Sequence, residues 1–121
     1  MNLEEVYNEI NGDYEDVLKR LRKPELVEKF VVKFLNDISY DDLIKALDEE
    51  NMENAFRAVH TLKGVCLNLS FVGLYKVSNE LTEMLRPGKE LANENEINEM
   101  VEKITAEYNL VKKGIKQLDN N

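Results

Sequence analysis

The chain has 121 residues, of which 43% are hydrophobic and 33% charged, a composition typical of one soluble globular domain and too apolar for a disordered chain. Its net charge of −8, without a segregated basic patch, argues against binding to nucleic acid or to an anionic membrane. The five glycines are scattered, so there is no glycine-rich phosphate loop, and use of ATP by the chain alone is not expected.

The amino terminus and the single cysteine indicate a cytoplasmic protein. Residues 1–6 are acidic and lack an apolar run, so no signal peptide is expected. No stretch approaches the roughly twenty apolar residues of a membrane span. Cys66 has no partner for an internal disulfide, which suits a reducing compartment.

Apolar residues recur every three or four positions along nearly the whole chain, which predicts an all-helical fold. Two short helices are expected first, one over 3–10 and a second, capped by Asp13, over 14–21. We interpret residues 1–22 as an N-terminal helical extension.

Longer helical segments follow. They cover residues 24–49, 51–69, 72–86 and 93–118. The first suits either one kinked helix or two abutting ones, and Asn51 and Asn93 are good caps for the second and the last. Their short connections favour an antiparallel four-helix bundle over 24–119, with the extension packed on one end or flank. The whole chain, 1–121, is thus expected to form a single domain.

The only histidine, His60, is followed by Lys63 and Gly64 at spacings that place all three on one side of a helix. With successive residues about 100° apart around the axis, the apolar core stripe falls on the opposite side. We therefore expect an exposed imidazole beside a fixed positive charge, with a glycine that leaves access to the ring. The large apolar residues Phe56 and Leu67 share this outer face, as in a docking surface.

Each of these residues also has a plainer interpretation. A lone surface histidine is usually inert, Lys63 suits any solvated face, and Gly64 suits close packing of another helix. Phe56 and Leu67 would be ordinary if the N-terminal helices covered them. Cys66, on the core stripe, is interpreted as a small buried hydrophobe.

The sequence holds no metal-binding pattern. A di-iron bundle needs a glutamate three residues before an inward-facing histidine on each of two helices, but Arg57 occupies that position before His60 and no second histidine exists. One histidine and one buried cysteine supply too few ligands for zinc. We therefore predict no metal and no cofactor bound by this chain.

The segment His60-Thr61-Leu62-Lys63-Gly64, with Asn68-Leu69 after it and helices on both sides, closely resembles the motif of histidine-containing phosphotransfer (HPt) domains. The resemblance extends through residues 30–35, 42–50, 55–69 and 74–86. One departure is visible. The family often has glycine directly after the Asn-Leu pair, whereas this chain has Ser70.

This resemblance implies a phosphocarrier. His60 would take a phosphoryl group from the aspartyl phosphate of one receiver domain and pass it to the aspartate of another. Such transfer depends on positioning and charge compensation, so Lys63 would balance the phosphoryl charge and Gly64 would give steric access. Thr82 and Arg86, on the following helix, are candidates to approach the phosphorylated ring. Contacts with the partner are expected from Phe56, Arg57, Leu67 and Asn68.

The resemblance also implies that Mg²⁺ belongs to the receiver, in a response regulator or hybrid histidine kinase, and that this chain is not an enzyme in its own right. A monomer is expected because the apolar patch is modest. Two alternatives stay open. One is a helical adaptor that binds a receiver or kinase without being phosphorylated; the other is the phosphoacceptor domain of a chemotaxis-type histidine kinase.

Overall fold

The computed structural model describes residues 1–119, so the last two residues of the expected domain lie outside the described residues. The described part contains helices and no strand, which confirms the all-helical prediction for it. The helices are α1 (Leu3–Glu9), α2 (Tyr14–Leu21), α3 (Pro24–Lys33), the 3₁₀ turn η1 (Phe34–Asn36), α4 (Ser39–Asp48), α5 (Met52–Leu69), α6 (Val72–Leu85) and α7 (Glu94–Lys116). Between residues 1 and 119, no helix combines the length and apolar character needed to cross a bilayer.

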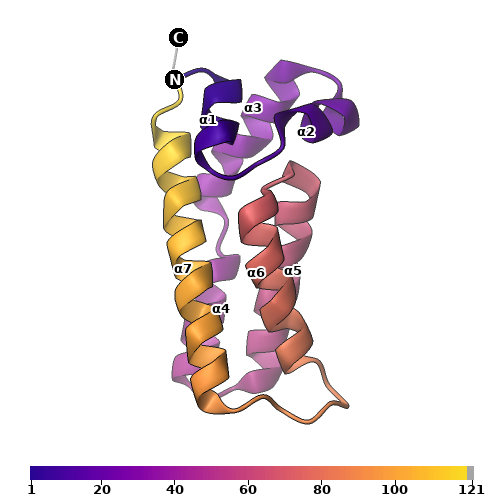
Figure 1. Cartoon of the computed structure of the whole chain (residues 1–121), viewed down its shortest axis with the longest axis vertical. Helices are drawn as coiled ribbons and strands as arrows, with labels where there is room; N and C mark the ends of the chain where they lie inside the picture. Colours follow the sequence, from indigo (N-terminus) through magenta and orange to yellow (C-terminus); the bar gives the residue numbers. More distant parts are fainter. Residues whose placement is uncertain (120–121) are drawn as a thin grey trace.

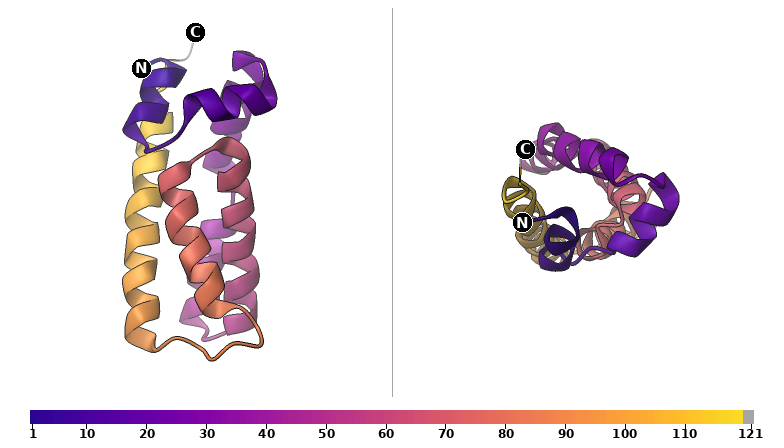
Figure 2. Two further views of the ribbon diagram at one scale, coloured as in Figure 1. Left: turned by 45° about the vertical axis from the view of Figure 1, so that its right-hand side comes forward. Right: turned by 90° about the horizontal axis from the view of Figure 1, so that it is seen from above.

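The two short N-terminal helices form where the sequence predicts them. The side chain of Asp13 accepts a hydrogen bond from the Asp16 amide at 3.0 Å and so caps α2. At α1, Asn2 and Glu5 form a reciprocal capping box. Both helices lie with α3 at one end of the molecule (Figures 1 and 2).

The segment 24–49 is two helices rather than one kinked helix. Pro24 stands in the first turn of α3, where its missing amide proton costs no hydrogen bond. After η1 the chain becomes extended at Asp37, whose carboxylate accepts a hydrogen bond from the Ser39 amide at 2.9 Å at the start of α4. This break lets α3 pack against α2 and α5.

The helices α4, α5, α6 and α7 lie side by side along the long axis of the molecule (Figure 1). α5 packs between α4 and α6, and α6 packs on α7. The Tyr40 ring of α4 stacks on Tyr108 of α7, with centroids 4.0 Å apart, and its hydroxyl is 2.7 Å from the Thr105 hydroxyl. Fully buried aliphatic side chains fill the space between these helices: Leu43, Val59, Leu62, Leu74, Leu81 and Ile104. Their burial is the main source of stability for the arrangement.

Candidate functional site

The helix α5 holds the only histidine on its outer face. The helix begins after Asn51, which accepts a hydrogen bond from the Asn54 amide at 3.0 Å, as predicted. Its inner stripe is buried and consists of Ala55, Val59, Leu62, Cys66 and Leu69. His60 is therefore held on the exposed side. Cys66 is fully buried, as predicted, and this burial raises the pKa of its thiol.

His60 has an aromatic ring on one side and open space on the other. The centroid of the Phe56 ring, one turn earlier, is 5.7 Å from that of the imidazole. One turn later, a Cβ added at Gly64 would meet no heavy atom within 4 Å. Lys63 is half-buried, and none of the ion pairs within residues 1–119 involves it. The imidazole thus lies one helical turn from an open position, and Lys63, three residues further along the helix, forms no ion pair within residues 1–119.

Arg86, just after α6, packs on the aromatic ring beside the histidine. Its guanidinium carbon lies 5.5 Å from the centroid of Phe56, a cation–π distance. The same guanidinium binds the Glu83 carboxylate through two nitrogens, with Nε 3.1 Å and Nη2 2.6 Å from Oε2. Hydrogen bonding from Arg86 lowers the pKa of the Glu83 carboxyl to about 2, so this carboxylate stays charged at neutral pH. Lys89 is a second cation near Glu83, with Nζ 3.5 Å from Oε1.

The remaining predicted site residues divide into those on this surface and one that is not. Arg57 is exposed and pairs with Glu53 at 2.6 Å, with side chains 69% and 71% exposed. Leu67 and Asn68 are also exposed, so the N-terminal helices do not cover them. Thr82 has no exposed surface, and its hydroxyl donates to the Ser78 carbonyl at 2.7 Å. Thr82 therefore does not reach the His60 surface, because its side chain packs in the core and its hydroxyl proton is already donated to the Ser78 carbonyl.

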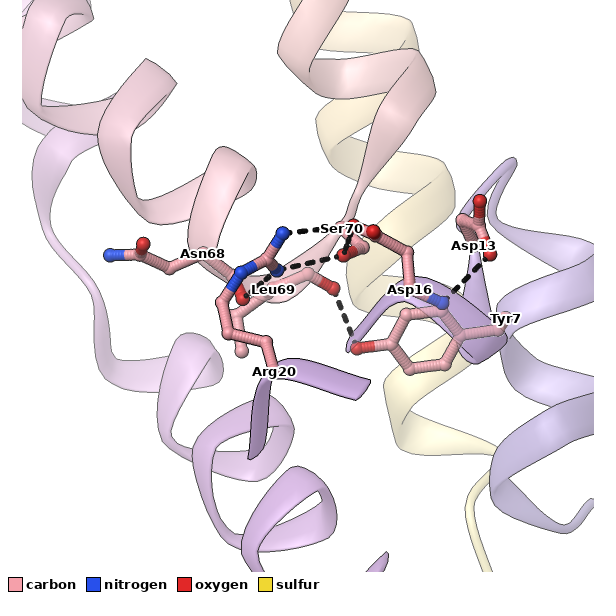
Figure 3. Close-up of polar contacts among 7 residues, drawn as sticks. All are labelled: Tyr7, Asp13, Asp16, Arg20, Asn68, Leu69 and Ser70. Carbon is pink, nitrogen blue, oxygen red and sulfur yellow. Dashed lines mark hydrogen bonds and ion pairs between the residues drawn. The ribbon is translucent and has the colours of Figure 1, made fainter. Parts of the chain in front are cut away.

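The C-terminal end of α5 is enclosed by polar contacts from α2. Ser70 caps the helix in the left-handed region, at φ 56° and ψ 38°, where a side chain is strained by about 1 kcal/mol relative to glycine. Its hydroxyl donates to Asp16 Oδ2 at 2.7 Å and accepts from Arg20 Nη1 at 3.0 Å. Arg20 in turn pairs with Asp16 at 2.9 Å. Figure 3 shows these side chains converging on the end of the helix.

Two carbonyls of the same helical turn are bound by the extension. Arg20 Nη1 donates to the Asn68 carbonyl at 2.9 Å, and the Tyr7 hydroxyl donates to the Leu69 carbonyl at 2.7 Å (Figure 3). The last carbonyls of a helix have no partner within the helix, so these bonds satisfy groups that would otherwise be orphaned. We call Tyr7, Asp16, Arg20 and Ser70 the α5 clamp.

A mostly apolar groove of about 570 Å³ adjoins the outer face of α5 near Asn68. Its walls come from α2, α3, η1 and α5, and its charged groups are the cations Arg20 and Lys33 and the carboxylate Asp37. The His60 face therefore continues toward the N-terminal extension. Within residues 1–119, no three His, Cys, Asp or Glu side chains are grouped so that they could hold a metal ion.

The chain belongs to the Hpt domain family, because the family model of the Hpt domain matches residues 25–120. No match was found among curated proteins or among solved structures. Membership in this family implies phosphotransfer in two-component signalling, in which Hpt domains are phosphocarriers that interact with receiver domains. The match starts in α3, so α1 and α2, which supply three of the four clamp residues, lie outside it.

Several residues around the site were not identified from the sequence alone. Glu83 precedes Arg86 by three positions, which is the spacing of an ion pair on a helix, so the sequence could have predicted this pair. Nothing local pairs Arg20 with Ser70, because fifty positions separate them.

Proposed function

We propose that this protein is a phosphorelay intermediate in which His60 accepts a phosphoryl group from the aspartyl phosphate of one receiver domain and passes it to the aspartate of another. The observation that carries the proposal is the exposed imidazole beside the empty space at Gly64, in a chain of the Hpt family. The receivers belong to response regulators or hybrid histidine kinases.

The chemistry requires a free ring nitrogen and a compensated charge. A neutral imidazole nitrogen attacks phosphorus, the bond from phosphorus to the aspartate oxygen breaks, and the carboxylate leaves with the electron pair. The transition state for such transfer is loose, so catalysis depends mainly on positioning and on cations near the phosphoryl oxygens. Lys63, half-buried and without an ion-pair partner within residues 1–119, supplies one such cation. Mg²⁺ and most of the catalytic groups are contributed by the receiver.

The docking surface consists of the outer face of α5. Phe56 and Leu67 give apolar contact, Arg57 and Asn68 give a polar margin, and Gly64 lets the receiver approach the ring. We take α4–α7 as the antiparallel four-helix bundle that presents this face, within the domain 24–119, and the protein as a monomer.

Phosphotransfer is tested by incubation with phosphorylated receiver domains of the same genome. We expect acid-labile phosphate on the wild-type chain and none on His60→Gln, with circular dichroism showing that the variant is still helical. Absence of label on the wild type with every receiver would contradict the proposal. Binding to a receiver without labelling would instead indicate an adaptor.

Lys63→Ala tests the compensating charge. We expect the rate of transfer from the receiver to fall about tenfold, which corresponds to roughly 1.4 kcal/mol of transition-state stabilisation, with unchanged helicity. Lys103→Ala, an exposed lysine on α7, removes the same charge away from α5 and is the matched control. An equal rate in Lys63→Ala and wild type removes this lysine from the mechanism.

A further inference from the structure

Arg57 and Arg86 each form an ion pair with a glutamate, but the two pairs differ in the number of contacts and in exposure. Arg57 makes one contact with Glu53, and both side chains are about 70% exposed. Arg86 makes a two-nitrogen contact with Glu83, and these side chains are 38% and 43% exposed. A multiply bonded, partly covered pair is held more firmly than a single contact in water. Arg86 is therefore the cation whose availability Glu83 controls.

Arg86 packs on the same aromatic ring that lies beside the imidazole. Its guanidinium carbon is 5.5 Å from the Phe56 centroid, which is itself 5.7 Å from the His60 centroid. An arginine side chain is flexible, and its planar guanidinium binds phosphate oxygens bidentately, as it binds a carboxylate. A phosphoryl group on His60 would place a dianion in competition with Glu83 for the same guanidinium.

We propose that Glu83 holds Arg86 away from the phosphorylated ring as a competing anion, and that this competition keeps the phosphoryl group on His60 labile. The inference rests on the proposed function and adds a positioning residue to it. Glu83 does not touch the reacting atoms; it acts through Arg86. The competition suits a carrier, because a phosphoryl group bound firmly by its own chain is passed on less readily.

The direction of the effect follows from the chemistry of phosphoryl loss. In hydrolysis, water attacks phosphorus, the nitrogen–phosphorus bond breaks, the ring nitrogen keeps the electron pair, and inorganic phosphate is released. A contact made fully in the starting state and not strengthened in the transition state slows a reaction. A guanidinium bound bidentately to the phosphoryl oxygens of the phosphohistidine is expected to act in this way during hydrolysis, whereas Lys63 acts during transfer, when a receiver positions the group. Releasing Arg86 from Glu83 should therefore prolong the phosphohistidine.

The experiment measures the half-life of phospho-His60 after labelling with phosphoramidate, a small donor from which the imidazole nitrogen displaces ammonia. Once the donor is removed, loss of acid-labile phosphate is followed at pH 8. We expect Glu83→Gln to lengthen the half-life three- to tenfold and Glu83→Asp, which keeps the anion, to stay near wild type. Glu80→Gln is the matched control, because it removes the same charge from an exposed position one turn earlier on α6.

The dependence on Arg86 is checked in the double variant Glu83→Gln/Arg86→Ala, where the longer half-life should disappear. Equal half-lives for Glu83→Gln and Glu80→Gln, or a longer half-life that persists without Arg86, would overturn the inference. In that case wild-type labelling at His60 would leave the phosphocarrier function standing. If the wild type accepted no phosphoryl group from phosphoramidate or from any receiver, both the phosphocarrier function and the role of Glu83 would be wrong.

Discussion

The middle of α5, around His60, and its C-terminal end, at Ser70, differ in how fully their polar groups are bound. Around His60, the neighbouring Gly64 position is empty and Lys63 has no ion-pair partner within residues 1–119. Around Ser70, which is 4% exposed, the polar atoms are bound by α1 and α2. An open face with unused bonding capacity is what a transient partner needs, whereas a closed end holds the helix in place.

The closed end explains how this chain does without the glycine often found after the Asn-Leu pair. A left-handed residue ends the helix in either case. Here the strain of a serine at φ 56° is offset by hydrogen bonds to two charged groups, Asp16 and Arg20. The N-terminal extension is therefore part of the end of α5 rather than a separate appendage.

The largest loss of stability is expected from Tyr7→Ala, which removes a side chain that holds the C-terminal end of α5. The ring is fully buried and lies 5.7 Å, centroid to centroid, from both Tyr14 and Phe71, while its hydroxyl binds the Leu69 carbonyl. Removing a buried aromatic side chain costs about 3–5 kcal/mol. We expect the free energy of unfolding in urea to fall by that amount.

The rate of His60 labelling by phosphoramidate should stay the same in the folded fraction of Tyr7→Ala, because Leu69 lies about 14 Å along the helix from His60. Tyr7→Phe is the control for packing and should cost about 1–2 kcal/mol for the orphaned Leu69 carbonyl. A change in labelling rate would show that the His60 region and the C-terminal end of α5 are coupled.

Replacement of Ser70 is expected to have the next largest effect and to depend on the substitute. Ser70→Ala loses the hydroxyl bonds to Asp16 and Arg20 and keeps the left-handed strain, so it should cost about 1–2 kcal/mol. Ser70→Gly loses the same bonds but relieves about 1 kcal/mol of strain, so it should be close to neutral. Chemical denaturation compares the two variants. A glycine variant no more stable than the alanine variant would contradict this explanation of the departure from the family.

On the open face around His60, Gly64→Ala should act in the opposite direction and stabilise the fold by about 0.5–1 kcal/mol. A glycine in a helix interior costs that much relative to alanine, and the added methyl meets no atom. Gly64→Gln should also fold, but it should accept phosphate from a receiver more slowly while phosphoramidate labelling is unchanged. Equal rates from the receiver would show that Gly64 does not give access.

Local signals in the sequence were enough to predict the helices, and they failed where distant segments meet. Asp13, Asn51 and Asn93 predicted their helix starts because a cap depends on residues within one turn. The outward position of His60 followed from periodicity alone. Ser70 gave no such signal, because its partner Arg20 lies fifty positions away. Thr82 was predicted to approach the ring because its helix neighbours that of His60, although its spacing from Leu74, Leu81 and Leu85 places it on the buried stripe of α6.

The smallest effect is expected from Asp16→Asn and should depend on pH. The Ser70 hydroxyl, and after it the Arg20 guanidinium, hold the pKa of the Asp16 carboxyl below its usual value. The charged form is therefore favoured in the folded state, and its contribution is present above about pH 4, the unfolded value, and is lost as the pH falls through the lower folded value. The difference in unfolding free energy between wild type and Asp16→Asn should thus be constant from pH 8 to about pH 5 and should shrink below about pH 4.

Glu15→Gln, the exposed neighbour in the same first turn, removes the same charge outside the α5 clamp and is the control. Two outcomes would show that Asp16 has no role in closing this end of α5. The stability advantage of the wild type over Asp16→Asn would grow as the pH falls, or Asp16→Asn and Glu15→Gln would show the same dependence of unfolding free energy on pH.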